Sequence, residues 1–112
     1  YGHIHGNTAL KHIAVIIKEL ARRPDICCRY GGEEFVVILP MCDLEGAAIY
    51  AERVRERIER TPVTIDNEAI HLTTSAGCAC MQHGEELAEF VHRADVALYQ
   101  AKEDGRNCVL KG

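Results

Sequence analysis

The sequence has no long apolar segment, no basic excess and no repeats, and these absences narrow the classes of protein to which it can belong. No apolar run approaches the roughly 20 residues needed to span a bilayer, and no signal peptide is visible. Thirteen basic residues against 17 acidic ones leave a net charge of −4, which argues against a general nucleic-acid binder. We therefore expect one soluble, cytoplasmic domain with no nucleic-acid partner, although a parent protein could be membrane-attached elsewhere.

Cysteine pairs with zinc-binding spacing are also missing. The chain has six cysteines but no CxxC pair, and its histidines do not complete a zinc site. Cys27 and Cys28 are adjacent, so on a strand they point to opposite faces, whereas Cys78 and Cys80 share one face. With 47% hydrophobic residues the chain can build a core without a disulfide framework. We predict reduced cysteines that serve as small buried hydrophobes.

The hydrophobic pattern predicts an α+β protein. Apolar residues at helical spacing predict helices over residues 8–21, 44–60 and 85–103, with Asn7 and Asp43 as N-caps of the first two. Strands are predicted over Ile26–Tyr30, Phe35–Leu39, Val63–Ile65, Ile70–Cys80 and Asn107–Leu110, the third and fourth flanking a turn at 66–68. The order α-β-β-α-β-β-α-β favours a mainly antiparallel sheet with helices on one side.

The most informative segment is RYGGEEF, residues 29–35. Two adjacent glycines between apolar runs predict a tight hairpin, with Glu33 and Glu34 at its tip. Gly31 and Gly32 lack a Cβ and so let a phosphate approach the main chain, and a neighbouring carboxylate can hold Mg²⁺. Taken alone, the tetrapeptide fits either this phosphate and metal site or an ordinary surface hairpin with solvated acids.

The residues on either side of the hairpin resemble one known family. RYGGEEF is similar to the signature hairpin of the GGDEF family, the diguanylate cyclases, in its GGEEF form. Residues 1–7, YGHIHGN, resemble the family's GHxxGD segment, with Asn7 where Asp is usual. Residues 22–25 resemble its RxxD inhibitory motif, residues 74–77 a late core strand, and residues 94–107 its terminal helix and exit. The resemblance covers essentially all 112 residues in order.

The same resemblance implies that a segment is missing. The family's domain opens with a strand that ends in a metal-binding Asp and with an FKxIND-like turn, and Tyr1 already lies past both. We expect residues 1–112 to be a single GGDEF-type domain lacking its N-terminal strand and first loop. With that strand restored, the fold would be ferredoxin-like, as in nucleotidyl cyclases. Because the absent strand would be central, we expect low stability or association with another copy.

A reaction follows from the resemblance. The family joins two GTP molecules into cyclic di-GMP, a bacterial second messenger, and releases two pyrophosphates, with each 3′-hydroxyl attacking the other nucleotide's α-phosphate in a homodimer. Glu33 would ligate Mg²⁺ or Mn²⁺ and assist deprotonation of the hydroxyl, and Glu34 is a second catalytic candidate. The resemblance also implies an upstream sensor domain in the parent protein, as expected in signal transduction.

The resemblance further implies which residues bind the substrate. Gly31 and Gly32 offer the close backbone approach, and Lys102 and Arg106 would contact the β- and γ-phosphates. Lys102 and Arg106 lie four apart, so they share one face if the helix continues that far, although alone they also fit a solvated helix end. Asn7 stands where the family's Asp accepts from guanine, and its amide is both donor and acceptor, so we expect weaker or looser base recognition.

Arg22 and Asp25, with Arg53 from the next helix, match the family's product-inhibition site for cyclic di-GMP. The planar fork of an Arg suits phosphates and guanine edges, and a carboxylate can accept from a guanine amine. In isolation this RxxD would be an ordinary charged loop. The resemblance favours the inhibitory site.

Three functional readings therefore stand. The first is a diguanylate cyclase catalytic domain that is inactive as the 112-residue chain alone. The second is a degenerate GGDEF domain that binds GTP or cyclic di-GMP as a receptor without turnover, a reading that Asn7 keeps open. The third is a ferredoxin-like interaction module with no nucleotide role, against which GGEEF, Lys102 and Arg106 all argue.

Overall fold

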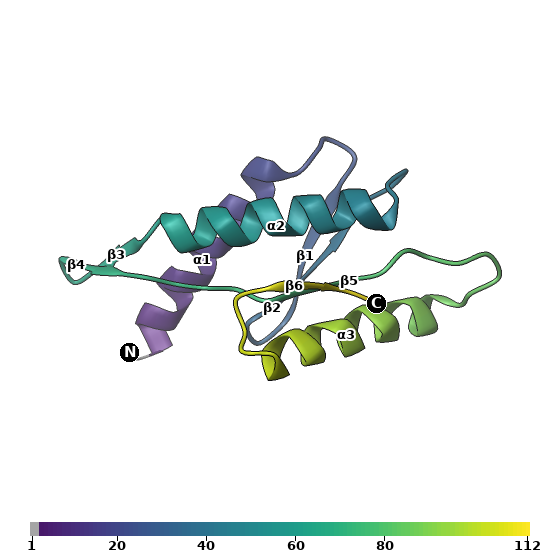
Figure 1. Cartoon of the computed structure of the whole chain (residues 1–112). Helices are drawn as coiled ribbons and strands as arrows, with labels where there is room; N and C mark the ends of the chain where they lie inside the picture. The colour runs from purple at the N-terminus through teal and green to yellow at the C-terminus, as the bar shows by residue number, and fades with distance from the viewer. Residues whose placement is uncertain (1–2) are drawn as a thin grey trace.

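A computed structural model describes the backbone of residues 3–112 and the side chains of residues 6–112. Within these residues three helices alternate with short strands (Figure 1). In chain order the elements are α1 (His3–Leu20), β1 (Ile26–Gly31), β2 (Glu34–Ile38), α2 (Leu44–Arg60), β3 (Val63–Ile65), β4 (Glu68–Ile70), β5 (Ala76–Cys78), α3 (Leu87–Glu103) and β6 (Val109–Lys111). The α+β class expected from the sequence is confirmed.

The strands of the described residues form three separate two-stranded ladders. β1 pairs with β2 and β3 with β4, both antiparallel, whereas β5 and β6 are parallel. Both α2 and α3 contact β5 and β6, and Figure 1 shows this strand pair between the two helices. The expectation of helices on one side of the sheet is therefore wrong, because α3 returns along the opposite side of β5–β6 from α2.

The core joins α1, α2 and the β1–β2 hairpin. Ile16 and Ile17 of α1 are buried against Val54 and Ile58 of α2, and Ile58 is fully buried. The i, i+4 spacing of Val54 and Ile58 places both on one face of α2, as the apolar pattern predicted. Partly buried residues that pack against this cluster come from α1, both hairpin strands, α2 and the segment after β4: Ile13, Leu20, Cys27, Phe35, Val37, Tyr50 and Leu72. This packing fixes the hairpin against α1.

A glycine allows α3 to pack directly on β5. A Cβ added to Gly77 would lie within 3.0 Å of the Ala94 carbonyl oxygen and the Leu98 amide nitrogen. The facing helix residues Ala97 and Ala101 are themselves small and buried. The close approach sets where the C-terminal end of α3, with Lys102, meets the rest of the molecule.

The N-cap predictions had opposite outcomes. Asp43 is the N-cap of α2, where its Oδ1 accepts from the Gly46 N–H at 2.7 Å. Asn7 is not a cap, because α1 already begins at His3 and Asn7 lies inside the helix. A side-chain cap contributes only about 1 kcal/mol, so it does not prevent the preceding residues from continuing the helix.

Other boundaries also differ from the expectation. The predicted strand Ile70–Cys80 is two short strands, β4 and β5, because residues 71–75 have no ladder partner in the described structure. Asp66 and Asn67, both with positive φ, form the two-residue turn between β3 and β4. α3 begins at Leu87 and β6 at Val109, each two residues later than predicted.

The six cysteines form no disulfide in the described structure, as predicted, but their burial is uneven. Cys78 is buried, whereas Cys28 is exposed, so the expectation of buried hydrophobes is wrong for Cys28. Cys80 lies beyond the end of β5 and so does not share a strand face with Cys78. Among the described residues no helix combines the length and apolar character that crossing a membrane requires.

Candidate nucleotide site

The tip of the β1–β2 hairpin is a two-residue loop made by Gly32 and Glu33. Arg29 pairs with Phe35 and Gly31 with Glu34, so Tyr30 is an extra residue, a bulge, on β1. Gly32 has a φ of 50° and Glu33 has no positive φ, the pattern of a type II′ turn that needs glycine first. The loop at the tip is shorter than the sequence predicted, because Glu34 already belongs to β2.

The backbone of the tip is open on the side where side chains would stand. A Cβ added to Gly31 or Gly32 would meet no atom within 4 Å. The Gly32 carbonyl oxygen accepts from Nε and Nη2 of Arg29 at 2.9 and 2.6 Å. Glu33 is exposed and Glu34 half-buried, and neither forms an ion pair within the described structure. An anion or a cation can therefore reach the tip without displacing a neighbour.

The carboxylates of the tip fit a metal ion by their chemistry but do not surround one. Glu33 and Glu34 supply hard oxygen ligands, the type that Mg²⁺ and Mn²⁺ prefer. No group of three or more His, Cys, Asp or Glu side chains that could hold a metal occurs in the part of the chain that the structure describes. Magnesium is commonly bound by only one or two carboxylates together with substrate phosphates, so two carboxylates suit it.

Lys102 and Arg106 lie at the C-terminal end of α3, where both are exposed. Lys102 is in the last helical turn, but the helix ends at Glu103 and Arg106 follows in a turn with a φ of 65°. The condition for a shared helix face is therefore not met. Neither side chain has an ion-pair partner among the described residues. In Figure 1 the hairpin tip and this helix end lie at the same end of the β5–β6 pair.

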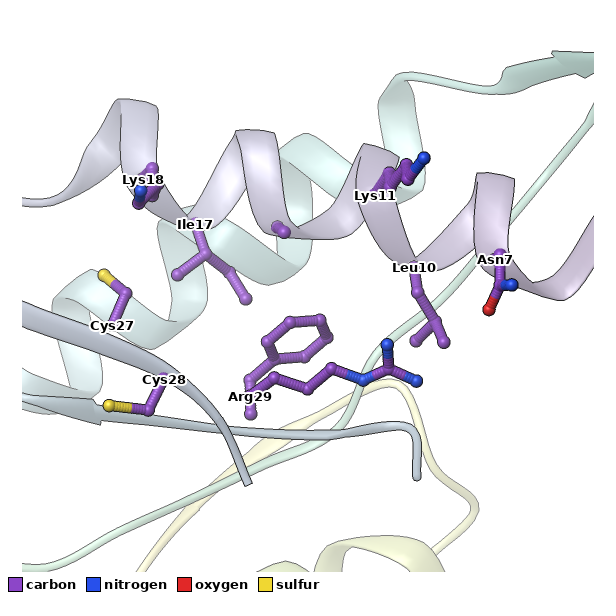
Figure 2. A pocket seen from close by; sticks show the side chains of 10 residues that line it. Asn7, Leu10, Lys11, Ile17, Lys18, Cys27, Cys28 and Arg29 are labelled. Atoms are coloured by element: carbon purple, nitrogen blue, oxygen red, sulfur yellow. The ribbon is translucent and has the colours of Figure 1, made fainter. Parts of the chain in front are cut away.

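A cavity of about 410 Å³ lies between α1 and the hairpin (Figure 2). Asn7 lines it, together with three cations that the sequence motifs did not indicate, Lys11, Lys18 and Arg29. Arg29 extends from β1 toward Leu10 and Asn7, as Figure 2 shows. The remaining residues that line the cavity are Leu10, Ala14, Ile17, Cys27, Cys28 and Phe35. The spacing of positions 7, 11, 14 and 18 along one helix face could have revealed Lys11 and Lys18.

A second cavity, of about 250 Å³, brings together the three residues of the predicted inhibitory site. Arg22, Asp25 and Arg53 all line it, with Leu20, Leu39, Cys42, Gly46, Ile49 and Tyr50. Nη2 of Arg22 lies 2.7 Å from Asp25 Oδ1 and 2.6 Å from the Pro40 carbonyl oxygen. The Asp25 side chain is 0% exposed, and its hydrogen bonds with Arg22 hold the pKa of its carboxyl below the usual value.

Comparison with known proteins places these features in one family. The sequence profile described as "Diguanylate cyclase, GGDEF domain" matches residues 1–108. The chain belongs to the GGDEF family. It is 41% identical over 110 residues to diguanylate cyclase A of Treponema denticola, an alignment that covers 97% of this chain and 30% of that protein.

Solved structures of the family share the fold of this GGDEF domain. Diguanylate cyclase SiaD of Pseudomonas aeruginosa, solved with its activator SiaC, has a TM-score of 0.95 at 37% identity, covering 100% of this chain and 43% of that one. The GGDEF domain of DgcB from Caulobacter crescentus, solved with c-di-GMP, has a TM-score of 0.94 at 33% identity, covering 99% and 67%. The chain spans about a third or less of the length of the curated relatives that it matches.

Proposed function

We propose that this GGDEF domain is the catalytic domain of a diguanylate cyclase, which converts two GTP molecules into cyclic di-GMP and two pyrophosphates. The observation that carries the proposal is the hairpin tip, where Glu33 is exposed in a two-residue loop next to glycines that face open space. Such a tip accepts a phosphate at its backbone and places a carboxylate beside it. An ordinary surface turn requires neither property.

The chain's own residues supply positioning and charge. Gly31 and Gly32 allow the α-phosphate to approach the main chain, and Arg29 holds the Gly32 carbonyl oxygen by two hydrogen bonds. Glu33 assists deprotonation of the attacking 3′-hydroxyl. Lys102 and Arg106 neutralise the β- and γ-phosphates, because both cations are exposed and have no internal ion-pair partner in the described structure.

Mg²⁺ or Mn²⁺ is the proposed cofactor. Glu33 would hold the ion, with Glu34 as a second carboxylate. Such an ion neutralises developing negative charge on the transferred phosphoryl group. The two nucleotides would come from two copies of the domain, so we propose a homodimer as the catalytic unit, in the cytoplasm and under the control of a sensor domain in the same protein.

The experiment is a turnover assay of the whole protein that carries this domain, with GTP and Mg²⁺. We expect Glu33→Gln to abolish cyclic di-GMP formation while leaving the unfolding transition unchanged, because the side chain is exposed. Glu68→Gln is the matched control, since Glu68 is an exposed acid directly after the other two-residue turn. Near-normal turnover by Glu33→Gln would reject the assignment in favour of Glu34. The same assay on the isolated 112 residues tests the expectation that they are inactive alone.

A second proposed function is the binding of cyclic di-GMP in the 250 Å³ cavity. It is supported by the convergence of Arg22 and Asp25, which lie in the loop before β1, with Arg53 of α2 on one cavity. Nε and Nη2 of Arg22 already donate to Asp25, so a ligand must share or replace these bonds.

Titration of labelled cyclic di-GMP into the same protein tests this site. Arg22→Ala and Arg53→Ala should each weaken binding at least tenfold, the effect of losing a charge-assisted hydrogen bond. Arg23→Ala is the control, because Arg23 is exposed beside Arg22 but does not line the cavity. Equal binding by the wild type and both variants would refute the site.

A further inference from the structure

The turn after α3 has an unfavourable backbone conformation at Arg106, the residue proposed above to contact the phosphates. Gly105, Arg106 and Asn107 have φ angles of 110°, 65° and 48°. Glycine adopts such angles freely and asparagine tolerates them, but they are unfavourable for a residue such as Arg. Contacts outside the helix must therefore hold Arg106 in place.

Asn107 supplies those contacts. Its backbone N–H donates to Ser75 Oγ at 3.0 Å, and its Oδ1 accepts from Arg55 Nη1 at 3.0 Å. Its Nδ2 donates to Glu59 Oε2. One half-buried residue thus connects the turn to α2 and to the segment before β5, two parts of the chain that are distant in sequence. We call Arg55, Glu59, Ser75 and Asn107 the Asn107 network.

Other residues of α2 hold the Arg55 side chain in the orientation that contacts the turn. Its Nε donates to both carboxylate oxygens of Glu52 at 3.0 Å, and its Nη1 also lies 3.4 Å from Glu59 Oε1. The Arg55 side chain is 14% exposed. Because the Glu52 carboxylate accepts from Nε of the guanidinium, Nη1 on the other side is left to donate to Asn107. Two members of the network, Arg55 and Glu59, therefore come from a helix, a more rigid support than a loop.

Arg106 lies between the Asn107 network and the end of α3. Its own N–H donates to the Ala101 carbonyl oxygen at 2.9 Å, which ties the turn back to the helix. Its exposed guanidinium has no hydrogen bond or ion pair within the described structure. The backbone of Arg106 is thus fixed on both sides while its side chain remains available to a ligand.

We propose that Asn107 is a positioning residue, which the network holds so that the left-handed turn directs Arg106 at the polyphosphate of the nucleotide. This inference rests on the proposed function, because it takes the triphosphate as the ligand of Arg106. Asn107 and Arg55 themselves do not touch the nucleotide. They act by removing the freedom of the turn before the ligand arrives, so that less ordering is needed on binding.

The test is a double-mutant cycle on the whole protein, with a GTP analogue whose α,β-bridge is a methylene group as the ligand. We expect Arg106→Ala to weaken binding at least tenfold. Asn107→Gly keeps the freedom to adopt positive φ but removes the amide, and it should weaken binding by a similar factor. Because both changes act through one side chain, the double variant should bind no worse than Arg106→Ala alone.

Two further measurements separate positioning from general stability. Amide exchange of residues 104–108 should accelerate at least tenfold in Asn107→Gly without ligand.

Asn107→Asp places two carboxylates together and should weaken binding. Asn107→Asp combined with Glu59→Gln restores a donor and an acceptor and should recover the binding. Gln100→Ala is the control, because it removes another side-chain bond at this helix end, the one from Gln100 to Asp104 at 2.7 Å.

The outcomes are distinguishable. If Arg106→Ala weakens binding but Asn107→Gly does not, or if the two effects add in full, the positioning role is overturned and the proposed function stands. If Arg106→Ala leaves affinity unchanged, the phosphate assignment of the proposed function is overturned, and the positioning role with it. If Asn107→Gly weakens binding without accelerating amide exchange at the turn, Asn107 contacts the nucleotide directly and the inference is again wrong.

Discussion

Glu85 is a carboxylate whose environment makes it a sensitive reporter of pH. Arg93 donates to it through Nε and Nη2, both at 2.7 Å, and the backbone N–H of Gln82 donates at 3.0 Å. The Glu85 side chain is only 6% exposed. The hydrogen bonds from Arg93, followed by that from Gln82, lower the pKa of Glu85 to about 2. Arg93 also donates to the Cys80 carbonyl oxygen, so this pair anchors the loop before α3.

We predict that this pair makes stability fall on acidification. An unfolded Glu titrates near 4.3 and the folded Glu85 near 2, so its contribution is complete above about pH 4.5 and is lost as the pH falls toward 2. Urea unfolding of wild type and Glu85→Gln at several pH values between 6 and 2 measures it. The difference in midpoint between the two should be largest at pH 6 and shrink toward pH 2. A difference independent of pH would mean that Glu85 does not titrate as described.

Asn7 is the residue whose identity departs from the family pattern, and the structure shows what surrounds it. It lies within α1 and lines the cavity that Arg29 and Lys11 share. An Asp there would accept two hydrogen bonds and carry a charge, whereas Asn offers one acceptor and one donor.

We therefore predict that Asn7→Asp lowers the KM for GTP of the whole protein and widens its preference for GTP over ATP. Charge-assisted hydrogen bonds exceed neutral ones by roughly 1 kcal/mol, so the expected change is about fivefold. Asn67→Asp, in the exposed β3–β4 turn, adds the same charge elsewhere and should change neither value. An unaltered KM in Asn7→Asp would show that this position does not read the base.

At the scale of elements, the contact of α3 with β5 is the closest that any glycine of the described residues makes. A Cβ at Gly77 would come within 3.0 Å of backbone atoms of Ala94, Ala97 and Leu98. Backbone cannot rotate away as a side chain can, so the helix itself must shift. The shift would move the C-terminal end of α3, where Lys102 lies.

Gly77→Ala should therefore destabilise the domain by about 1–3 kcal/mol, the usual effect of overpacking. Gly6→Ala is the matched control, because a Cβ at Gly6 meets nothing within 4 Å and the residue lies inside α1. That change should stabilise by roughly 0.5–1 kcal/mol. The free energy of unfolding from urea titration measures both, and equal effects of the two changes would contradict the tight contact.

The whole molecule exposes more surface than its mass predicts. Its accessible surface is 7560 Å², whereas a compact monomer of 12.5 kDa has about 6,200 Å². The excess agrees with the strand pattern, since β2 and β5 each pair on one side only in the described structure. Two-stranded ladders are marginally stable by themselves, and unpaired edges favour association.

We predict that the 112-residue chain unfolds at a low temperature or associates with copies of itself. Light scattering after size exclusion and thermal unfolding at several protein concentrations measure this. Association should raise the unfolding midpoint with concentration, by mass action. A monomer with concentration-independent, cooperative unfolding and a stability above roughly 5 kcal/mol would contradict the prediction.

Local patterns in the sequence were sufficient for much of the fold. The apolar stripe of α2, its Asp43 cap and the glycine-centred hairpin each depend on residues within one or two turns of each other, so the sequence alone identifies them. The motifs around Glu33 and Lys102 likewise identified the family, because they are short and occur in order. The local prediction that failed was the N-cap at Asn7, since a cap preference cannot reveal that the chain before it is already helical.

Only the tertiary structure decided which distant residues meet. The family resemblance grouped Arg22 with Arg53, but residue spacing alone could not place them in one cavity. The sequence also gave no sign that Arg55 would hold Asn107, 52 positions away. It could not show that α3 would pack on β5 at Gly77, on the side opposite α2. These contacts depend on how helices and strands pack together, and packing is set by the shapes of whole surfaces rather than by the spacing of neighbours along the chain.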